Sequence, residues 1–305
     1  GLKYKIQCIF TVTIQSPVEL IKYLTHSEID KHLWDKCIYH SVNRLTYAMS
    51  WWLDTVSPGW EALVQDDYTA VMPLTGRRRF GIDYLYQPYL TQQLGVFSVN
   101  KPEPEDVDEF LNAIPEKFMY VDIHLNSTNV PLNHNFTYSA RNNFTLDMTR
   151  SYVHLLAGYH RNCRRNLQKA VQSGLEVKSG PTPAVFTSFV ERNLDKKVQD
   201  MGKKICPVIR EITQASIQQG VGEIKGVYKP NGKLVAAGWF VYDMGRCFFG
   251  ICASTKEGKD SQSMYLLVDH AIENRAGKGE IFDFTGSMVP GVAYFNAGFG
   301  AVKSH

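Results

Sequence analysis

The sequence lacks the motifs that mark common hydrolase and metal sites. Its 305 residues include six cysteines, without a Cys-x-x-Cys pair and without histidines at zinc-ligand spacing. We therefore expect neither a metal site nor a disulfide framework, but cysteines that serve as small core residues in a reducing cytosol. Gly-x-Ser-x-Gly, His-Glu-x-x-His and phosphate-loop lysine motifs are also absent. Nucleophilic-serine, zinc-hydrolase and nucleotide-hydrolysis functions consequently lack support.

Long hydrophobic runs are missing too. No segment approaches the roughly 20 apolar residues that a membrane-spanning helix requires. The run over residues 6–14 is too short and too polar to span a bilayer, and no small-residue cleavage site follows it, so we expect a β-strand there. These features predict a cytoplasmic protein without a membrane span.

The sequence also lacks a large excess of charge of one sign. The 33 Lys and Arg residues nearly balance the 30 Asp and Glu residues, which leaves a formal net charge of +3. Any affinity for nucleic acid or phosphate must then be local. The length, with 44% hydrophobic residues, suffices for two packed cores, and two domains of about 130–150 residues are expected.

Helix-like and strand-like patterns alternate along the chain, which predicts a mixed α+β fold. Helices are expected at residues 27–38, 47–53, 102–114, 151–171, 185–194, 208–219 and 263–274. Strands are expected at residues 60–65, 69–74, 84–86, 94–97, 118–125, 144–148, 223–228, 233–242, 246–253 and 281–284. In each half a strand pattern meets a basic turn and an aromatic strand, with Arg77, Arg78 and Arg79 in the first of these turns. We therefore predict two copies of one fold, at residues 1–150 and 151–305.

One predicted helix carries a concentrated basic face. Arg161, Arg164 and Arg165 share this face with Gln168, whereas apolar side chains share the opposite face. Arginine makes forked contacts to phosphate oxygens, so the basic face could hold a diphosphate or a nucleic-acid backbone. A solvated charged face explains the same pattern.

Aromatic and amide side chains gather between residues 84 and 95. Tyr86, Gln87, Gln92 and Gln93 supply hydrogen-bond donors and acceptors beside aromatic surface. Such a set can hold a sugar, a nucleobase or a peptide in a dry cleft. An ordinary aromatic strand edge accounts for the tyrosines equally well.

One carboxylate stands out near the end of the chain. Asp283 closes a strand that is otherwise hydrophobic, where it could accept a proton from an attacking amine or orient that amine. In the alternative, structural role, Asp283 accepts hydrogen bonds from the turn at residues 285–287.

The order of three short motifs resembles the FemAB/FemX family of peptidoglycan-bridge aminoacyltransferases. These motifs are the basic helix ending in Lys169-Ala170 ahead of Gly174, the strand Phe282-Asp283-Phe284 ahead of Gly286, and the terminal Gly298-Phe299-Gly300. The likeness covers residues 19–301. It implies two tandem domains of the N-acyltransferase (GNAT) type, with mixed, mostly antiparallel sheets. Two departures are the lack of a heptad-bearing segment for the coiled-coil arm of some members, and the stop at His305, where a last strand is expected.

The resemblance also implies roles for particular residues. In the family, the amino group of a precursor attacks an aminoacyl-tRNA ester, and the segment at 86–93 would line the acceptor cleft. The phosphate-binding role would fall to Arg161, Arg164, Arg165 and Lys169, and the donor would be bound by Lys259, Ser261 and Tyr265. The loop at 254–262 corresponds to the pyrophosphate loop of acetyl-CoA-dependent relatives, but Ser261, Gln262 and Ser263 stand where glycines are expected.

Our leading hypothesis is an N-acyltransferase that moves an aminoacyl or acyl group to an amine of a cell-wall precursor, such as a nucleotide-linked muropeptide, or of a similar metabolite. The donor, aminoacyl-tRNA or acyl-CoA, is a co-substrate, and no cofactor is expected because positioning and backbone N–H groups can supply much of the rate. The alternatives are a CoA-dependent N-acetyltransferase and a non-enzymatic module that binds nucleotide-linked sugars or RNA.

Overall fold

The computed structural model describes residues 20–132, 135–193, 196–285 and 288–304. The strand predicted at 6–14 lies outside the described residues. The α-helices are α1 (Lys31–His40), α2 (Ser50–Val56), α3 (Pro104–Asn112), α4 (Tyr152–Ala157), α5 (Arg161–Gln172), α6 (Pro183–Asn193), α7 (Lys196–Gln218), α8 (Lys256–Asp260), α9 (Ser263–Arg275) and α10 (Pro290–Gly298). The strands are β1 (Ile21–Leu24), β2 (Glu61–Gln65), β3 (Ala70–Leu74), β4 (Gly76–Arg79), β5 (Ile82–Tyr86), β6 (Phe97–Ser98), β7 (Phe118–Asp122), β8 (Asn143–Asp147), β9 (Glu176–Ser179), β10 (Gly222–Tyr228), β11 (Leu234–Asp243), β12 (Arg246–Ser254), β13 (Ile281–Asp283) and β14 (Val302–Ser304).

These strands form three sheets. A four-stranded sheet has the order β1-β2-β3-β6, and a three-stranded sheet has the order β4-β5-β7. The largest sheet has the order β14-β8-β13-β12-β11-β10-β9 and is antiparallel except for the pair β12 and β13. The predicted mixed α+β fold with mostly antiparallel sheets is therefore confirmed.

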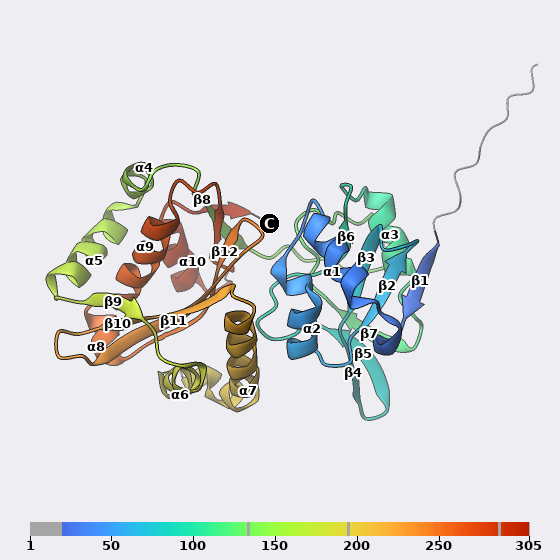
Figure 1. Ribbon diagram of the computed structural model, residues 1–305, viewed down its shortest axis with the longest axis horizontal. Helices are drawn as coiled ribbons and strands as arrows, with labels where there is room; N and C mark the ends of the chain where they lie inside the picture. The colour runs from blue at the N-terminus through green and yellow to red at the C-terminus, as the bar shows by residue number, and fades with distance from the viewer. Residues whose placement is uncertain (1–19, 133–134, 194–195, 286–287, 305) are drawn as a thin grey trace, which may run out of the picture.

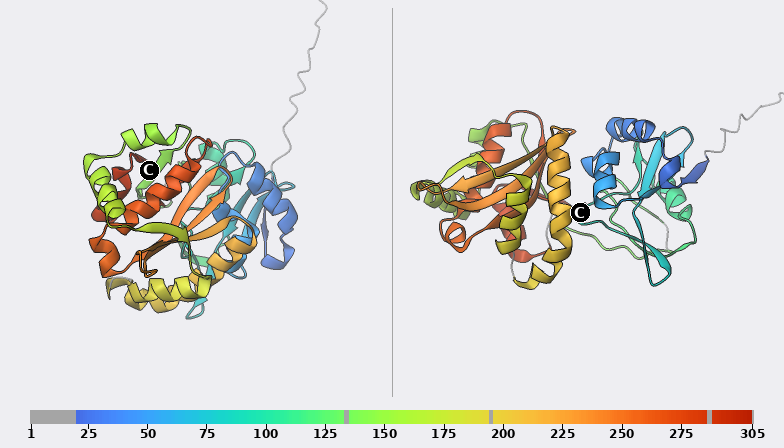
Figure 2. Two further views of the ribbon diagram at one scale, coloured as in Figure 1. Left: turned by 60° about the vertical axis from the view of Figure 1, so that its left-hand side comes forward. Right: turned by 60° about the horizontal axis from the view of Figure 1, so that its bottom comes forward.

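Helices cover both faces of the seven-stranded sheet (Figure 1). Side chains of α5, α9 and α10 pack on one face in a core that includes Leu167, Leu267 and Phe299. On the other face α6 and α7 share a second core with the N-terminal half, in which Trp52 meets Trp239. The two halves, which lie side by side in Figures 1 and 2, are thus joined through apolar packing.

Strands β1 to β7 belong to the two smaller sheets, and strands β8 to β14 form the seven-stranded sheet. β8 precedes the predicted boundary at residue 150, yet it pairs with both β13 and β14 in the large sheet. The antiparallel partners of β8 lie at residues 281–283 and 302–304, far downstream in the chain, so no local pattern could assign it. The division into two domains stays a prediction.

Several local expectations differ from the structure. The helix expected at 208–219 begins at Lys196, and of the strand expected at 94–97 only Phe97 belongs to β6. The single helix expected at 151–171 is broken after Ala157, because the N–H of His160 donates to the carbonyl of Gly298 on α10 (2.8 Å). The expected loop at 254–262 contains α8, capped by Thr255. Arg77, Arg78 and Arg79 belong to β4 rather than to a turn, because their backbone pairs with β5.

Candidate active site

The central strands β12 and β13 separate soon after they pair. Their parallel ladder covers only Arg246–Phe248 and Ile281–Asp283. Farther along β12, Gly250 and Ile251 stand opposite the single residue Trp239 of β11, because the register shifts there. Such a bulge leaves the extra residue outside the ladder, so backbone groups can face the opening between the strands.

Gly250 is required at the bulge by its close neighbours. A Cβ atom at this position would lie 2.6 Å from Cε3 of Trp239, a distance that side chains do not tolerate. Trp239 is itself held, because its indole N–H donates to Oγ of Ser216 (3.0 Å). The strand can therefore bulge here only with glycine.

A cavity of about 420 Å³, which we call the α9 cavity, opens where the strands part. Its walls come from β12, from the start of α9 and from α10, and they include Phe249, Cys252, Gly258, Lys259, Tyr265, Phe295 and Asn296. Asn296 is 2% exposed, and its Nδ2 has no hydrogen-bond partner among the described residues. A buried amide without a partner costs about 1–3 kcal/mol, which a ligand oxygen in this cavity would offset.

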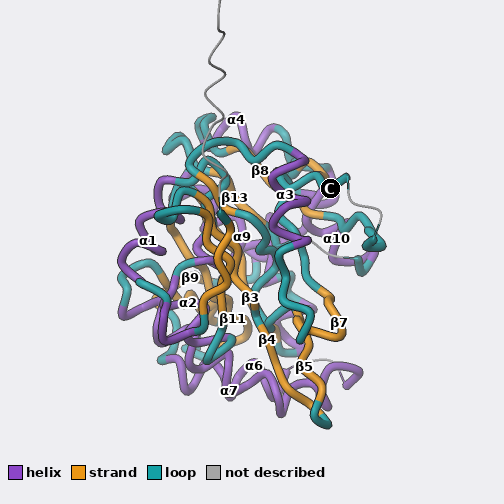
Figure 3. The backbone as a smooth tube through the Cα atoms, turned by 90° about the vertical axis from the view of Figure 1, so that its right-hand side faces the viewer, coloured by secondary structure: helices purple, strands orange, loops and turns teal. Residues whose placement is uncertain are grey.

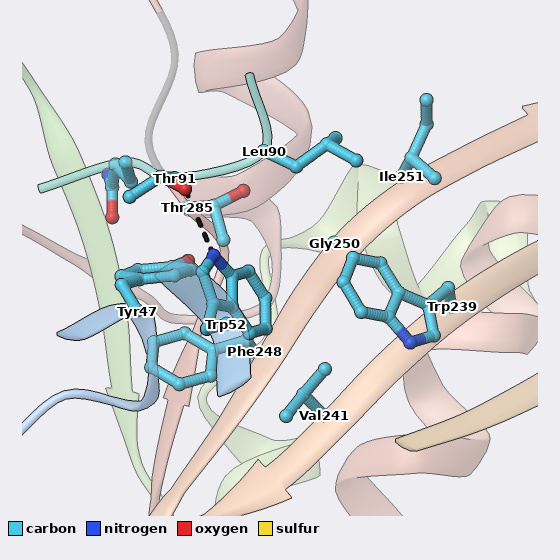
Figure 4. A pocket seen from close by; sticks show the side chains of 11 residues that line it. Tyr47, Trp52, Leu90, Thr91, Trp239, Val241, Phe248, Gly250, Ile251 and Thr285 are labelled. Atoms are coloured by element: carbon cyan, nitrogen blue, oxygen red, sulfur yellow. Dashed lines mark hydrogen bonds between the residues drawn. The ribbon is translucent and has the colours of Figure 1, made fainter. Parts of the chain in front are cut away.

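A second cavity of about 290 Å³, the interface cavity, lies between the two halves (Figure 4). The N-terminal half contributes Tyr47, Trp52 and the segment at 90–92, and β11 and β12 form the opposite wall. The rings of Trp52 and Trp239 stack at 5.7 Å, and the indole N–H of Trp52 donates to Oγ1 of Thr91 (3.0 Å). No charged side chain occurs among the described residues that line this cavity.

The two cavities meet at Gly250 and Thr285, which line both. Thr285 has a positive φ of 59°, a strained conformation for a β-branched residue. Its Oγ1 donates to the carbonyl of Phe249 (3.1 Å), and its N–H donates to Oδ1 of Asp283 (2.9 Å). The left-handed turn is thus fixed from two sides, at the point where molecules in the two cavities would touch.

No protein-family model matches the sequence, and no curated protein does. The crystal structure of FemX superposes with a TM-score of 0.65 over 93% of this chain and 95% of that chain, at 12% identity. The fold is that of FemX. A conserved protein from Bacteroides thetaiotaomicron (TM-score 0.56, 8% identity, 90% of this chain and 95% of that one) and L-PGS from Bacillus licheniformis (0.50, 11%, 90% and 89%) are also similar.

Within this FemX fold, the predicted catalytic Asp283 is fully buried and held by three partners. Its Oδ2 accepts from Nη1 of Arg246 (3.1 Å), its Oδ1 accepts from the Thr285 N–H, and Asn143 donates a further hydrogen bond. Burial raises the pKa of Asp283, and Arg246 opposes that rise. Asp283 does not line either cavity, and its catalytic role stays a prediction.

The predicted residue Gln92 is connected to Asp283 across the two halves. Gln92 lines the interface cavity, and its Nε2 donates to Oδ1 of Asn143 (3.0 Å). Asn143 in turn contacts Asp283. A polar chain therefore runs from the interface cavity to the turn at Thr285.

The other predicted residues of the aromatic and amide segment, Tyr86, Gln87 and Gln93, line neither cavity. Gln87 braces its own loop, since its Nε2 donates to the carbonyl of Thr91 and its Oε1 accepts from the N–H of His124 (both 2.9 Å). Gln93 donates to Gln92 (3.3 Å). The Tyr86 ring is covered by the guanidinium of Arg77, 4.2 Å from the ring centroid.

The predicted donor residues separate into two groups. Lys259 and Tyr265 line the α9 cavity, whereas the hydroxyl of Ser261 donates to the carbonyl of Glu257 (2.7 Å) and does not line it. The basic residues of α5 are exposed and line neither cavity. Figures 1 and 2 place α5 on the side of the seven-stranded sheet away from the N-terminal half.

Three of the predicted residues line a cavity, Gln92, Lys259 and Tyr265, but sequence reasoning missed Tyr47, Gly250 and Asn296. Tyr47 and Asn296 belong to short helices in which nothing in the local pattern marks a binding residue. Gly250 was a detectable signal, because glycine inside a strand often marks a bulge. In the described part of the chain no helix is long and apolar enough to cross a membrane, and no cluster of three His, Cys, Asp or Glu side chains could hold a metal ion.

Proposed function

We propose that this protein is an N-acyltransferase that transfers an aminoacyl group from an RNA-borne ester to an amine. The acyl group would occupy the α9 cavity, and the amine would enter through the interface cavity. The observation that carries the proposal is the meeting of the two cavities at the bulge of Gly250, with the unpartnered amide of Asn296 in the wall of the first. Two reactants bound in adjoining cavities have the geometry that a transfer reaction requires.

The reaction at this junction is an attack on a carbonyl carbon. The amine nitrogen forms the amide bond as the ester C–O bond breaks, and the proton that the amine loses goes to the leaving hydroxyl. A backbone N–H at the bulge can stabilise the negative charge on the carbonyl oxygen. The Tyr47 hydroxyl stays protonated because burial raises its pKa, so it can donate a hydrogen bond to the departing oxygen.

The basic face of α5 supports RNA as the carrier of the acyl group. Arg161, Arg164, Arg165 and Lys169 are exposed, and no carboxylate of the described residues forms an ion pair with them. On the inner side of α5, Asn166 forms a hydrogen bond with Tyr265, which lines the α9 cavity. An RNA backbone on α5 would therefore lie next to the wall of the α9 cavity.

The interface cavity supports an amine carried on an apolar stem. Its aromatic and aliphatic walls would disfavour a charged group at depth, since a buried charge without a partner is costly. The amine must arrive neutral to react. Its stem can pack against Trp52, Trp239 and Leu90, which line the cavity. A side-chain amine of a cell-wall peptide meets this description, with the nucleotide part of such a precursor outside the cavity.

A second donor class, acyl-CoA, is favoured by one observation. Gly258 and Lys259 lie at the rim of the α9 cavity, next to the N-terminal end of α9, and helix N-termini stabilise phosphates. A transfer assay with both donors distinguishes acyl-CoA from an RNA-borne ester.

The test is a transfer assay with two donors, aminoacylated tRNA and acetyl-CoA, and amine acceptors with aliphatic, aromatic or acidic stems. We expect turnover with aminoacylated tRNA and an apolar-stem amine, and a loss of about tenfold or more in kcat/KM for Asn296→Ala. Turnover with acetyl-CoA and none with aminoacylated tRNA would show that the donor is an acyl-CoA and not an RNA-borne ester. No transfer from either donor by folded protein would refute the acyltransferase function.

A further inference from the structure

The hairpin of β4 and β5 projects from the N-terminal half, as Figures 1 and 3 show. Its register pairs Arg79 with Ile82, so Phe80 and Gly81 form the two-residue turn at the tip. The Phe80 side chain is 88% exposed and that of Ile82 is 51% exposed. Large apolar side chains so exposed at a projecting tip are typical of a surface that binds a partner.

Phe80 also holds a backbone conformation that is unfavourable for its residue type. Phe80 and Gly81 both have positive φ values, 52° and 80°, as in the hairpin turn that usually contains Asn-Gly. A bulky aromatic residue is strained there. Since the Phe80 ring is almost fully exposed, burial within this chain does not compensate for the strain.

The exposed apolar surface continues onto β7, which runs parallel beside β5. The register aligns Tyr84 with Tyr120, and Met119 lies at the irregularity just before this pair. Met119 is 76% exposed and Tyr120 is 62% exposed. We call Phe80, Ile82, Met119 and Tyr120 the apolar patch.

Positive charge accompanies the apolar patch. Between Gly76 and Tyr86 the sequence contains three arginines and one carboxylate, Asp83. Nε of Arg78 lies 3.8 Å from Oδ1 of Asp83, and the Arg79 guanidinium lies over the Phe80 ring at 4.9 Å from its centroid. The hairpin thus combines a net positive charge with apolar side chains at its end.

We propose that this hairpin docks the protein on an anionic lipid surface. Phe80 and Ile82 insert at the boundary between head groups and acyl chains, while the arginines of β4 bind head-group phosphates. Charge complementarity selects an anionic partner. Phe80 and Tyr120 offer rings on which a base could stack, whereas Ile82 and Met119 are not aromatic and offer none, and these two side chains favour lipid over RNA. This docking is independent of the proposed acyl transfer.

The experiment is co-sedimentation of the full chain with vesicles. Vesicles of phosphatidylglycerol and phosphatidylcholine in equal amounts should bind the protein, and pure phosphatidylcholine vesicles should bind it weakly. Binding should weaken with added salt. Phe80→Ala with Ile82→Ala should lower the partition coefficient more than tenfold, and each of Arg78→Gln and Arg79→Gln should lower it about fivefold. Val153→Ala removes an exposed apolar side chain of α4 and should change nothing.

A second measurement is independent of any loss of fold in the alanine variants. In Phe80→Trp, the emission of the added tryptophan, taken as the difference from the parent with its five native tryptophans, should shift to shorter wavelength when anionic vesicles are added. An unshifted emission, or equal sedimentation of the parent and the Phe80→Ala, Ile82→Ala variant, would overturn the proposal. Single-stranded RNA binding that the arginine substitutions abolish, with sedimentation unaffected by them, would overturn it in favour of an RNA surface.

Discussion

Replacing Asp269 by asparagine is expected to remove a pH-dependent loss of stability. Asp269 lies on α9 and is buried. Its carboxylate accepts hydrogen bonds from the hydroxyls of Tyr152 and Tyr159, the latter at 3.0 Å. Burial raises the pKa of Asp269 to about 6, against these two hydrogen bonds, which lower it.

The proton affinity of Asp269 sets the direction of the pH effect. An aspartate in the unfolded chain has a pKa of about 3.9, so between that pH and about 6 the folded chain holds the proton more tightly. The stabilisation from this proton is fully present below pH about 4 and is lost as the pH rises through about 6. A difference of about two pKa units corresponds to about 3 kcal/mol in the free energy of unfolding.

Urea unfolding of the parent and of Asp269→Asn, at pH about 4.5 and about 7.5, measures this contribution. The variant should gain about 2 kcal/mol relative to the parent over this interval, because part of the full difference is already lost at pH about 4.5. Other titrating groups cancel in the comparison. Tyr152→Phe is the matched control, because it removes a hydrogen bond to the carboxylate and should extend the loss of stability to higher pH. A difference between parent and variant that stays constant with pH would refute the reasoning.

Three further substitutions test the site. Gly250→Ala forces a methyl group against the Trp239 ring and should lower the unfolding free energy by about 1–3 kcal/mol together with kcat, as thermal unfolding and initial rates would show. Asp283→Asn leaves Arg246 without its charged partner and should lower the unfolding free energy by roughly 3 kcal/mol. The turnover of the molecules that remain folded should be unchanged. A decrease of about 10²–10⁴-fold in kcat would instead support proton transfer by Asp283. Arg161→Ala with Arg165→Ala should weaken RNA binding, reduce its salt dependence by about two phosphate contacts and leave the melting temperature unchanged; unaltered RNA affinity would contradict the role of α5.

Patterns that depend on near neighbours were readable from the sequence. The amphipathic spacing of α5 predicted its basic exposed side and the burial of Cys163, Leu167 and Ala170, whereas Val171, expected on the same buried face, is exposed. The apolar run that ends at Asp283 predicted β13. The helix expected at 27–38 is present, but α1 begins only after Asp30, whose carboxylate accepts from the N–H groups of His32 and Leu33. The order of the three short motifs in the second half of the chain sufficed to indicate the FemX fold, because periodicity and turn residues act over a few positions.

Contacts between distant residues were decided by the tertiary structure alone. β8 joins the large sheet through partners far along the chain, and the interface cavity combines Tyr47 with Trp239 and Thr285. The unsatisfied amide of Asn296 and the burial of Asp283 arise only when α10 and β12 are packed in place. Burial and hydrogen-bond satisfaction depend on which segments meet, so the sequence alone supplied the residue types of this site, and packing decided which of them face a cavity.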